Sequence, residues 1–277
     1  MNRSFAFASF LLLASLLTGC GGGKHAASEK TYEQKAKAFG ETIIAQPAEN
    51  QWDKIPVIDK EWIASVNFGI RKPNYVMIHH TAQKSVDETV RTFQLERTQV
   101  SAHYVVGRNG KIVQMVNDYF RAHHAGAGIW GNDTDLNSSS IGIELDNNGT
   151  TDPWTDAQIN ALIQLLTKLK TTYKIPQANF IGHMDFAPTR KPDPANFPWD
   201  RLAKAGFGFW YDMPLAPAPV DLDVRVALRV IGYDIKNLDA AIKGFKRHYI
   251  PQNANSTTWT DHEKAILYNI YMKYLYL

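Results

Sequence analysis

Apolar and polar positions follow a regular pattern between about residues 70 and 185. Short apolar runs predict five strands, at 75–79, 102–107, 111–116, 141–145 and 180–183. The second and third runs flank Asn109-Gly110, a dipeptide that favours the tight turn of a β-hairpin. This part of the chain is therefore predicted to contain a β-sheet with one hairpin.

Two stretches between these strands have helical spacing, and each begins with a capping box. Ser85 and Glu88 form the first box, and Thr155 and Gln158 form the second. Pro176 prevents the second helix from continuing, because proline lacks the N–H that an interior turn needs. Strands that alternate with helices, together with one hairpin, predict an α/β fold with a mixed β-sheet flanked by helices.

The first twenty residues have the pattern of an export signal. Arg3 provides a positive start, an apolar stretch follows over 5–17, and Leu-Thr-Gly-Cys ending at Cys20 resembles a bacterial lipobox. We therefore expect a lipoprotein signal peptide over 1–19, with the lipid attached to Cys20. Gly21 after the cysteine, rather than aspartate, favours the outer membrane, with the protein facing the periplasm. The alternatives are an ordinary signal peptide with an incidental cysteine, and a buried helix.

Composition divides the rest of the chain into a body and a tail. Residues 20–35 are polar and predict a flexible tether, and a proline-rich run over 213–219 predicts a rigid linker. Between them, 36–212 forms the main body, and 220–277 forms the tail. The tail has helical spacing at 222–231, 238–249 and 259–274. It is predicted to be a small all-α domain of three helices with an interaction role.

The overall composition narrows the possible functions. The 277 residues are 44% hydrophobic and 21% charged, which excludes a disordered or fibrous protein. The net charge of +3 is too small to indicate a nucleic-acid partner. Because the chain has one cysteine, it forms no internal disulfide, CxxC zinc site or iron–sulfur cluster. Since that cysteine, Cys20, is expected to carry a lipid at the far end of the tether, any metal site must use histidine and carboxylate ligands.

Three residues could form such a site. His79 and His183 end two predicted strands, and Asp193 follows on a proline-stiffened loop. Strand ends on one edge of a sheet converge, so these groups could be three ligands of a tetrahedral zinc ion whose fourth position stays open for water. Side chains alternate along a strand, so only one of His79 and His80 can reach the site. The pattern leaves open which one does.

Five blocks in order along the chain show a family resemblance. They are MIHHTA from residue 77, SAHY from 101, HHAG from 123, SIGIELDN from 140 and GHMDFAPTRKPDP from 182. Together they resemble the zinc-dependent N-acetylmuramoyl-L-alanine amidases, the amidase-2 family shared with animal peptidoglycan recognition proteins. The resemblance covers about residues 70–210. With its lipobox and tail, the chain is most similar to outer-membrane lipoproteins of that family, in which the tail corresponds to a three-helix peptidoglycan-binding domain.

The resemblance implies the chemistry of the site. It makes His79, His183 and Asp193 the ligands of one Zn²⁺ per chain. Zinc lowers the pKa of a bound water to about 7 and so supplies hydroxide near neutral pH. The implied reaction is hydrolysis of the amide between N-acetylmuramic acid and L-alanine in peptidoglycan or muropeptides. The implied role is cell-wall turnover or recycling.

Two further residues are predicted to assist the reaction. Glu144 is the candidate general base, because the isoleucines and leucine of 141–145 share one strand face and leave Glu144 beside Gly142 on the other. The family pattern implies that Lys191 stabilises the tetrahedral oxyanion. The alternatives are a glutamate on a solvated strand face and a lysine on the protein surface.

Other residues in these blocks have two interpretations. Arg190 could bind the carboxylate of the stem peptide through a bidentate pair, or it could face solvent. His124 resembles a substrate-lining histidine, and His103 either packs within the sheet or lines the cleft. Trp130 and Trp154 could stack on sugar rings or cover an edge of the core.

Two other functions are compatible with parts of the sequence. A non-catalytic peptidoglycan-recognition lipoprotein could have the same fold, but such binders typically lack a metal ligand or a catalytic residue, whereas all are present in this sequence. A structural lipoprotein that links the outer membrane to the cell wall would explain only the tether and the tail.

Overall fold

The computed structural model describes residues 23–44, 65, 67 and 69–277. The chain divides into two compact units, Met1–Asn67 and Phe68–Leu277. The predicted signal peptide (1–19) and Cys20 lie outside the described residues. Among the helices that are described, none combines the length and the apolar character needed to cross a bilayer.

The first unit contains one described helix, α1 (Ala26–Ile44), and none of its residues is buried. This finding differs from the flexible tether expected over 20–35 and from a main body that begins at residue 36. The segment is rich in alanine, glutamate and lysine, which favour helix without a packed core. The second unit, which holds the sheet, begins at residue 68 instead.

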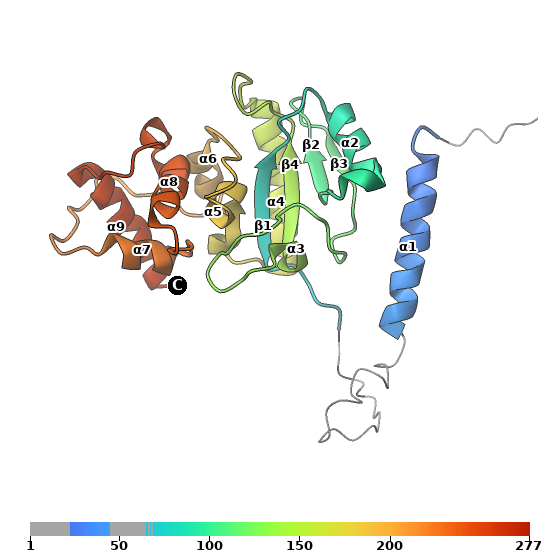
Figure 1. Cartoon of the computed structure of the whole chain (residues 1–277), viewed down its shortest axis with the longest axis horizontal. Coiled ribbons are helices and arrows are strands. Elements are labelled where there is room, and N and C mark those ends of the chain that lie inside the picture. Colours follow the sequence, from blue (N-terminus) through green and yellow to red (C-terminus); the bar gives the residue numbers. More distant parts are fainter. Residues whose placement is uncertain (1–22, 45–64, 66, 68) are drawn as a thin grey trace, which may run out of the picture. The chain divides into compact units, whose positions relative to one another are not determined.

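The second unit is built on a five-stranded mixed sheet with the order β3-β2-β4-β1-β5 (Figure 1). The strands are β1 (Tyr75–His80), β2 (Tyr104–Val106), β3 (Ile112–Gln114), β4 (Ser140–Leu145) and β5 (Phe180–Gly182). β1 is parallel to β4 and to β5, β2 is parallel to β4, and only the β2–β3 hairpin is antiparallel. All five predicted strands are confirmed, but β5 ends at Gly182 and His183 begins a helix.

Helices occupy the segments between and after the strands. They are α2 (Val86–Gln94), α3 (Leu136–Ser139), α4 (Asp156–Tyr173), α5 (His183–Phe186), α6 (Trp199–Lys204), α7 (Val224–Ile231), α8 (Leu238–Tyr249) and α9 (Asp261–Leu275). Both predicted N-caps are confirmed: the hydroxyls of Ser85 and Thr155 accept backbone N–H groups at the starts of α2 and α4. Helix α4 ends three residues before Pro176, as the sequence predicts.

Side-chain alternation gives the sheet two buried faces. The first face packs against α4 and contains Val76, Ile78, Ile141, Ile143 and Leu145 of the strands. The second face packs partly against the C-terminal helices, through Met77 and Ile181. His79 and Glu144 alternate with residues of the first face, so they lie on the second.

The three helices predicted in the tail are confirmed as α7, α8 and α9. They differ from expectation in their packing. Apolar residues of all three share one core cluster with Met77 of β1, Ile181 of β5 and Phe186 of α5, so they do not form a separate module behind a linker. Within this unit they lie next to α5 and α6, at the end opposite α2 (Figure 1). Their binding of peptidoglycan stays a prediction.

Candidate active site

The three predicted metal ligands meet at the carboxyl edge of the parallel strands. His79 Nδ1 lies 2.9 Å from His183 Nδ1 and 3.3 Å from Asp193 Oδ2, and His183 Nδ1 lies 3.1 Å from the same oxygen. All three side chains are buried. The predicted convergence is therefore confirmed, with His79 rather than His80 on the side of the site.

The geometry of these three groups fits a zinc ion. Ligands about 2.0–2.1 Å from a tetrahedral zinc ion are about 3.4 Å from one another, close to the separations of 2.9–3.3 Å observed. His183 Nε2 lies 2.9 Å from the carbonyl oxygen of Ala125, and this contact places the proton on Nε2. In the neutral ring, Nδ1 then presents its lone pair to the centre, as a metal ligand must.

Burial prepares two of these groups for metal binding. Burial, and then the neighbouring His183, lower the pKa of His79 to about 4, so its ring is neutral at pH 7. Burial alone would raise the pKa of Asp193, but the adjacent rings of His183 and His79 outweigh this effect and hold the pKa below its ordinary value. A neutral imidazole and an ionised carboxylate are the forms that bind a metal.

Glu144 lies beside His79 on the neighbouring strand, since the two residues pair in the β1–β4 register. Its Oε2 is buried and has no hydrogen-bond partner among the described residues. Burial, and then the negative charge of Asp193, raise the pKa of Glu144 to about 8, while the charge of Lys191 opposes them. In its ionised form, Glu144 has a buried oxygen that faces the cleft without a partner and is well placed to accept a proton.

The metal-binding groups line a cleft of about 410 Å³. Glu144, Lys191 and His124 contribute polar groups to its lining, and Phe93 and Val100 add apolar surface. A cation that faces the same cleft as the metal-binding groups can stabilise negative charge on a reacting oxygen. The arrangement can therefore bind a metal, accept a proton and stabilise an oxyanion.

Comparison with known proteins identifies the family. The family model described as N-acetylmuramoyl-L-alanine amidase (Amidase_2) matches residues 69–196. N-acetylmuramoyl-L-alanine amidase AmiD of Escherichia coli K12 is 33% identical over 270 residues, which cover 86% of this chain and 87% of AmiD. The chain belongs to the N-acetylmuramoyl-L-alanine amidase family. The catalytic alternative is thereby favoured over a non-catalytic recognition protein.

Solved structures agree with this assignment. E. coli AmiD in complex with the substrate anhydro-N-acetylmuramic acid-L-Ala-D-γ-Glu-L-Lys is 32% identical, with a TM-score of 0.65, over 78% of this amidase and 95% of the AmiD chain. AmpDh3 of Pseudomonas aeruginosa is 27% identical, with a TM-score of 0.66, over 80% of this amidase and 100% of that chain. These likenesses confirm the predicted fold class.

His124 of this amidase lines the cleft and also contacts His79, one of the candidate metal ligands. Its Nδ1 lies 3.0 Å from His79 Nε2, and its own Nε2 lies 3.3 Å from the Ser140 hydroxyl. The ring packs directly over Gly142, where a side chain would overlap it. The residue predicted to line the substrate site thus also helps to orient His79.

Arg190 and His103 have partners within the protein. Arg190 Nη2 donates to two carbonyl oxygens of the loop 125–127, at 2.9 and 2.7 Å, although the residue also lines the cleft. His103 is fully buried. Its Nδ1 accepts the Gly142 N–H, and its Nε2 donates to the Phe120 carbonyl, each at 3.0 Å. These contacts place His103 within the sheet, and a role in substrate binding stays a prediction.

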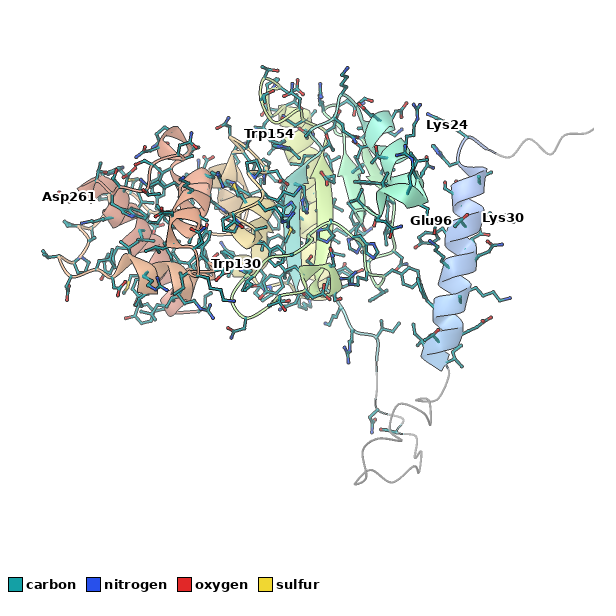
Figure 2. All side chains as sticks on the ribbon, in the orientation of Figure 1. Lys24, Lys30, Glu96, Trp130, Trp154 and Asp261 are labelled. Atoms are coloured by element: carbon teal, nitrogen blue, oxygen red, sulfur yellow. The ribbon has the colours of Figure 1, made fainter. Side chains whose placement is uncertain are left out.

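The two tryptophans cover parts of the core. Trp130 is buried and meets the ring of Tyr233 edge-on at 5.0 Å. Trp154 meets Phe197 in the same way at 5.0 Å, and its Nε1 donates to the Ala195 carbonyl. Figure 2 shows them in different parts of the unit, with Trp130 near the C-terminal helices. Of the two interpretations, covering a core edge is confirmed.

Two residues of the site region had no predicted role. His80 Nδ1 accepts the N–H of Ala195, two residues after Asp193, the third candidate metal ligand. Asp185 is fully buried, and its Oδ2 accepts the N–H of Gly182, immediately before His183. An acidic residue three positions after a helix N-cap is the sequence signature of this backbone contact, so it could have indicated a role for Asp185.

Proposed function

We propose that this amidase is a zinc enzyme that hydrolyses the amide between N-acetylmuramic acid and L-alanine, in peptidoglycan or in muropeptides released from it. One observation carries the proposal: buried His79, His183 and Asp193 converge at a cleft that also contains Glu144 and Lys191. The substrate in the solved AmiD complex supports the choice of bond, since it joins anhydro-N-acetylmuramic acid to L-alanine. The role we propose is turnover or recycling of the cell wall.

Each residue of the cleft has a separate role in the proposed reaction. A Zn²⁺ ion held by His79, His183 and Asp193 would supply Lewis acidity, which lowers the pKa of water and polarises a carbonyl group. Glu144 takes a proton from the attacking water at Oε2. Lys191 stabilises the negative charge on the carbonyl oxygen as the C–O bond forms. Glu144 then gives its proton to the leaving nitrogen of L-alanine as the C–N bond breaks.

Glu144→Gln tests the general base. The amide has nearly the same size but cannot take the proton, so we expect kcat to fall by roughly 10²- to 10⁴-fold with the zinc content unchanged. Mass spectrometry of stem peptide released from a defined anhydromuropeptide measures the effect. Glu41→Gln, on the exposed surface of α1, is the control. A near-wild-type rate in Glu144→Gln would refute this assignment.

Removal of the metal tests zinc dependence. A chelator should abolish hydrolysis, and added Zn²⁺ should restore it at one equivalent per chain. Elemental analysis of each sample verifies the loss and the recovery of metal. Hydrolysis that persists in verified metal-free protein would contradict a zinc mechanism.

We also propose that Cys20 carries a lipid and holds the enzyme on the outer membrane, facing the periplasm. The support is the signal-like sequence of residues 1–19 and the residues around Cys20. Mass spectrometry of the mature protein should show acyl groups on an N-terminal Cys20. Cys20→Ser should lose this mass and leave the membrane fraction, and a variant that stays there unchanged would argue against the anchor.

A further inference from the structure

Asp185 connects the candidate metal centre to the C-terminal helices. Its Oδ2 accepts N–H groups from Gly182 and from His248 Nδ1, both at 2.8 Å, and its Oδ1 accepts the Tyr233 hydroxyl at 2.7 Å. Gly182 immediately precedes the ligand His183, whereas Tyr233 follows α7 and His248 lies on α8. The carboxylate is fully buried, so these donors replace the water that it would otherwise bind.

Helix α8 contacts the segment 183–188 at two more points. A side chain at Gly244 would place its Cβ 2.9 Å from Pro188 Cβ and 3.1 Å from the Met184 carbonyl oxygen, so the helix approaches here as closely as glycine allows. Arg247 Nη1 donates to the Pro188 carbonyl at 3.2 Å. The helix therefore contacts both ends of the segment that begins with His183.

The His248 ring is itself held between two aromatic rings. Trp199 of α6 stacks on it at 4.1 Å and Tyr249 at 4.2 Å, with interplanar angles of 20° and 22°. Trp199 also lies against Gly182, where an added Cβ would be 2.9 Å from the indole. Packing against Trp199 and Tyr249 therefore fixes the orientation of His248 toward Asp185. Trp199 links this packing to Gly182, the residue before His183.

We propose that the C-terminal helices position His183 for metal binding, through the contacts of His248 and Tyr233 with Asp185. The inference rests on the proposed zinc-dependent function. Two things set the direction of the His183 ring: the hydrogen bond from its Nε2 to the Ala125 carbonyl, and the position of the backbone at 182–183. Groups that orient a ligand typically change metal affinity by 10- to 100-fold when they are removed. Asp185, Tyr233 and His248 are then positioning residues.

Three variants test this inference in the full chain. His248→Leu and Tyr233→Phe each remove one donor to Asp185. We expect each to raise the dissociation constant for Zn²⁺ about tenfold or more, and to lower kcat with little change in KM. Competition with a chelating dye measures the affinity, and the visible spectrum of the Co²⁺-loaded protein reports the ligand geometry. His248→Asn, whose side-chain N–H can replace Nδ1, should restore most of the affinity.

The control and the outcomes separate positioning from general stability. Tyr268→Phe, in α9, loses a hydroxyl in a ring that contacts Tyr271, and it should bind Zn²⁺ normally. Variants that melt earlier but keep wild-type zinc affinity and kcat below that temperature would overturn the inference, as would a His248→Asn variant as weak as His248→Leu. Tyr233→Phe keeps its ring, so it remains informative if His248→Leu fails to fold.

Failure of the proposed function would look different. A wild-type chain that binds no Zn²⁺ would overturn the zinc mechanism and this inference together. A wild-type chain that binds Zn²⁺ but leaves muropeptides intact would overturn the proposed reaction, while the affinities of the variants would still decide whether the C-terminal helices position His183.

Discussion

The Lys191 side chain carries a charge whose effect can be isolated. It lines the cleft, and its charge lowers the pKa of Glu144 against the larger effects of burial and of Asp193. Lys191→Met keeps the aliphatic stem and removes the charge. We expect kcat to fall by roughly 10²- to 10³-fold, about 3 to 4 kcal/mol in the barrier, with little change in zinc affinity.

Steady-state kinetics on a defined anhydromuropeptide measure this loss. The matched control is Lys168→Met, on the exposed side of α4, which should keep its activity. If Lys191→Met turns over at the wild-type rate, Lys191 takes no part in stabilising the oxyanion.

Residues at strand ends were predictable, and their hydrogen-bond partners were not. His79 and His183 could be placed together because parallel strands end on one edge, and the resemblance then selected His79 over His80. The contact of His124 with His79 depends on the path of the loop before β4, which no local periodicity determines. The clamp of Arg190 on the loop 125–127 is likewise a contact between distant segments.

At the scale of the elements, α8 approaches α5 closely at Gly244, and a substitution there should have two opposed effects on stability. Gly244→Ala should gain about 1 kcal/mol of helix propensity. The new Cβ would however meet Pro188 at 2.9 Å and the Met184 carbonyl oxygen at 3.1 Å. Overpacking typically costs about 1–3 kcal/mol, so we expect a net loss of stability.

Thermal unfolding followed by circular dichroism measures the effect. Gly40→Ala is the control, since nothing lies within 4 Å of an added Cβ on the exposed helix α1. That substitution should raise the helix content or leave it unchanged. A Gly244→Ala variant more stable than the wild type would show that α8 can move away without loss.

Helices α8 and α9 are joined by a buried ion pair. Lys246 Nζ lies 3.2 and 3.1 Å from the two carboxylate oxygens of Glu263. Burial alone would raise the pKa of Glu263, but hydrogen bonds from the Thr260 N–H, Asn253 and Lys246 outweigh it and lower the pKa. The ionised group therefore stabilises the fold above about pH 4.3, its value in an unfolded chain, and this stability is lost as the pH falls through the folded-state pKa.

Glu263→Gln tests this pH dependence. At pH 7 the variant should be less stable than the wild type by about 3 kcal/mol, because Lys246 keeps a buried charge without its partner. Below about pH 4.3 the difference should shrink, because the wild type also loses the carboxylate charge. Melting temperatures between pH 3 and 7 measure both effects, with exposed Asp261→Asn as the control. A difference that does not change with pH would contradict this explanation.

Local signals predicted element boundaries well where the cause was local. Ser85 and Thr155 cap the helices that they were expected to start. Helix α1 was missed because low hydrophobicity was interpreted as a flexible tether, although its residues have high helix propensity. β5 ends one residue before the predicted end at His183. The reason is that the Gly182 N–H donates to the carboxylate of Asp185, three residues later, and the helix begins there.

For the molecule as a whole, bound metal should stabilise the fold. An ion that binds only the folded chain stabilises it by about 4.1 kcal/mol at a thousand times its dissociation constant. For a unit of this size, that corresponds to a rise in melting temperature on the order of 10 °C. Differential scanning calorimetry of metal-free protein with and without Zn²⁺ measures it. His183→Ala should show no rise, and an equal rise in that variant would place the stabilising ion elsewhere.

The number of helices in the tail was predictable, but their partner was not. The spacing of apolar residues over 222–274 shows that each helix has one buried face. It does not show what covers that face, and the proline-rich run suggested a separate module. In the structure the faces of α7–α9 share a core with Met77, Ile181 and Phe186.

The candidate ligands come from distant parts of the polymer, with His79 separated from His183 by 104 positions and from Asp193 by 114. An unfolded polypeptide holds no such trio in one place, so it has no site for the ion. If the chain crosses the inner membrane unfolded, as its proposed export implies, it travels without metal. The enzyme would then become competent only at its destination, with zinc acquired from that compartment.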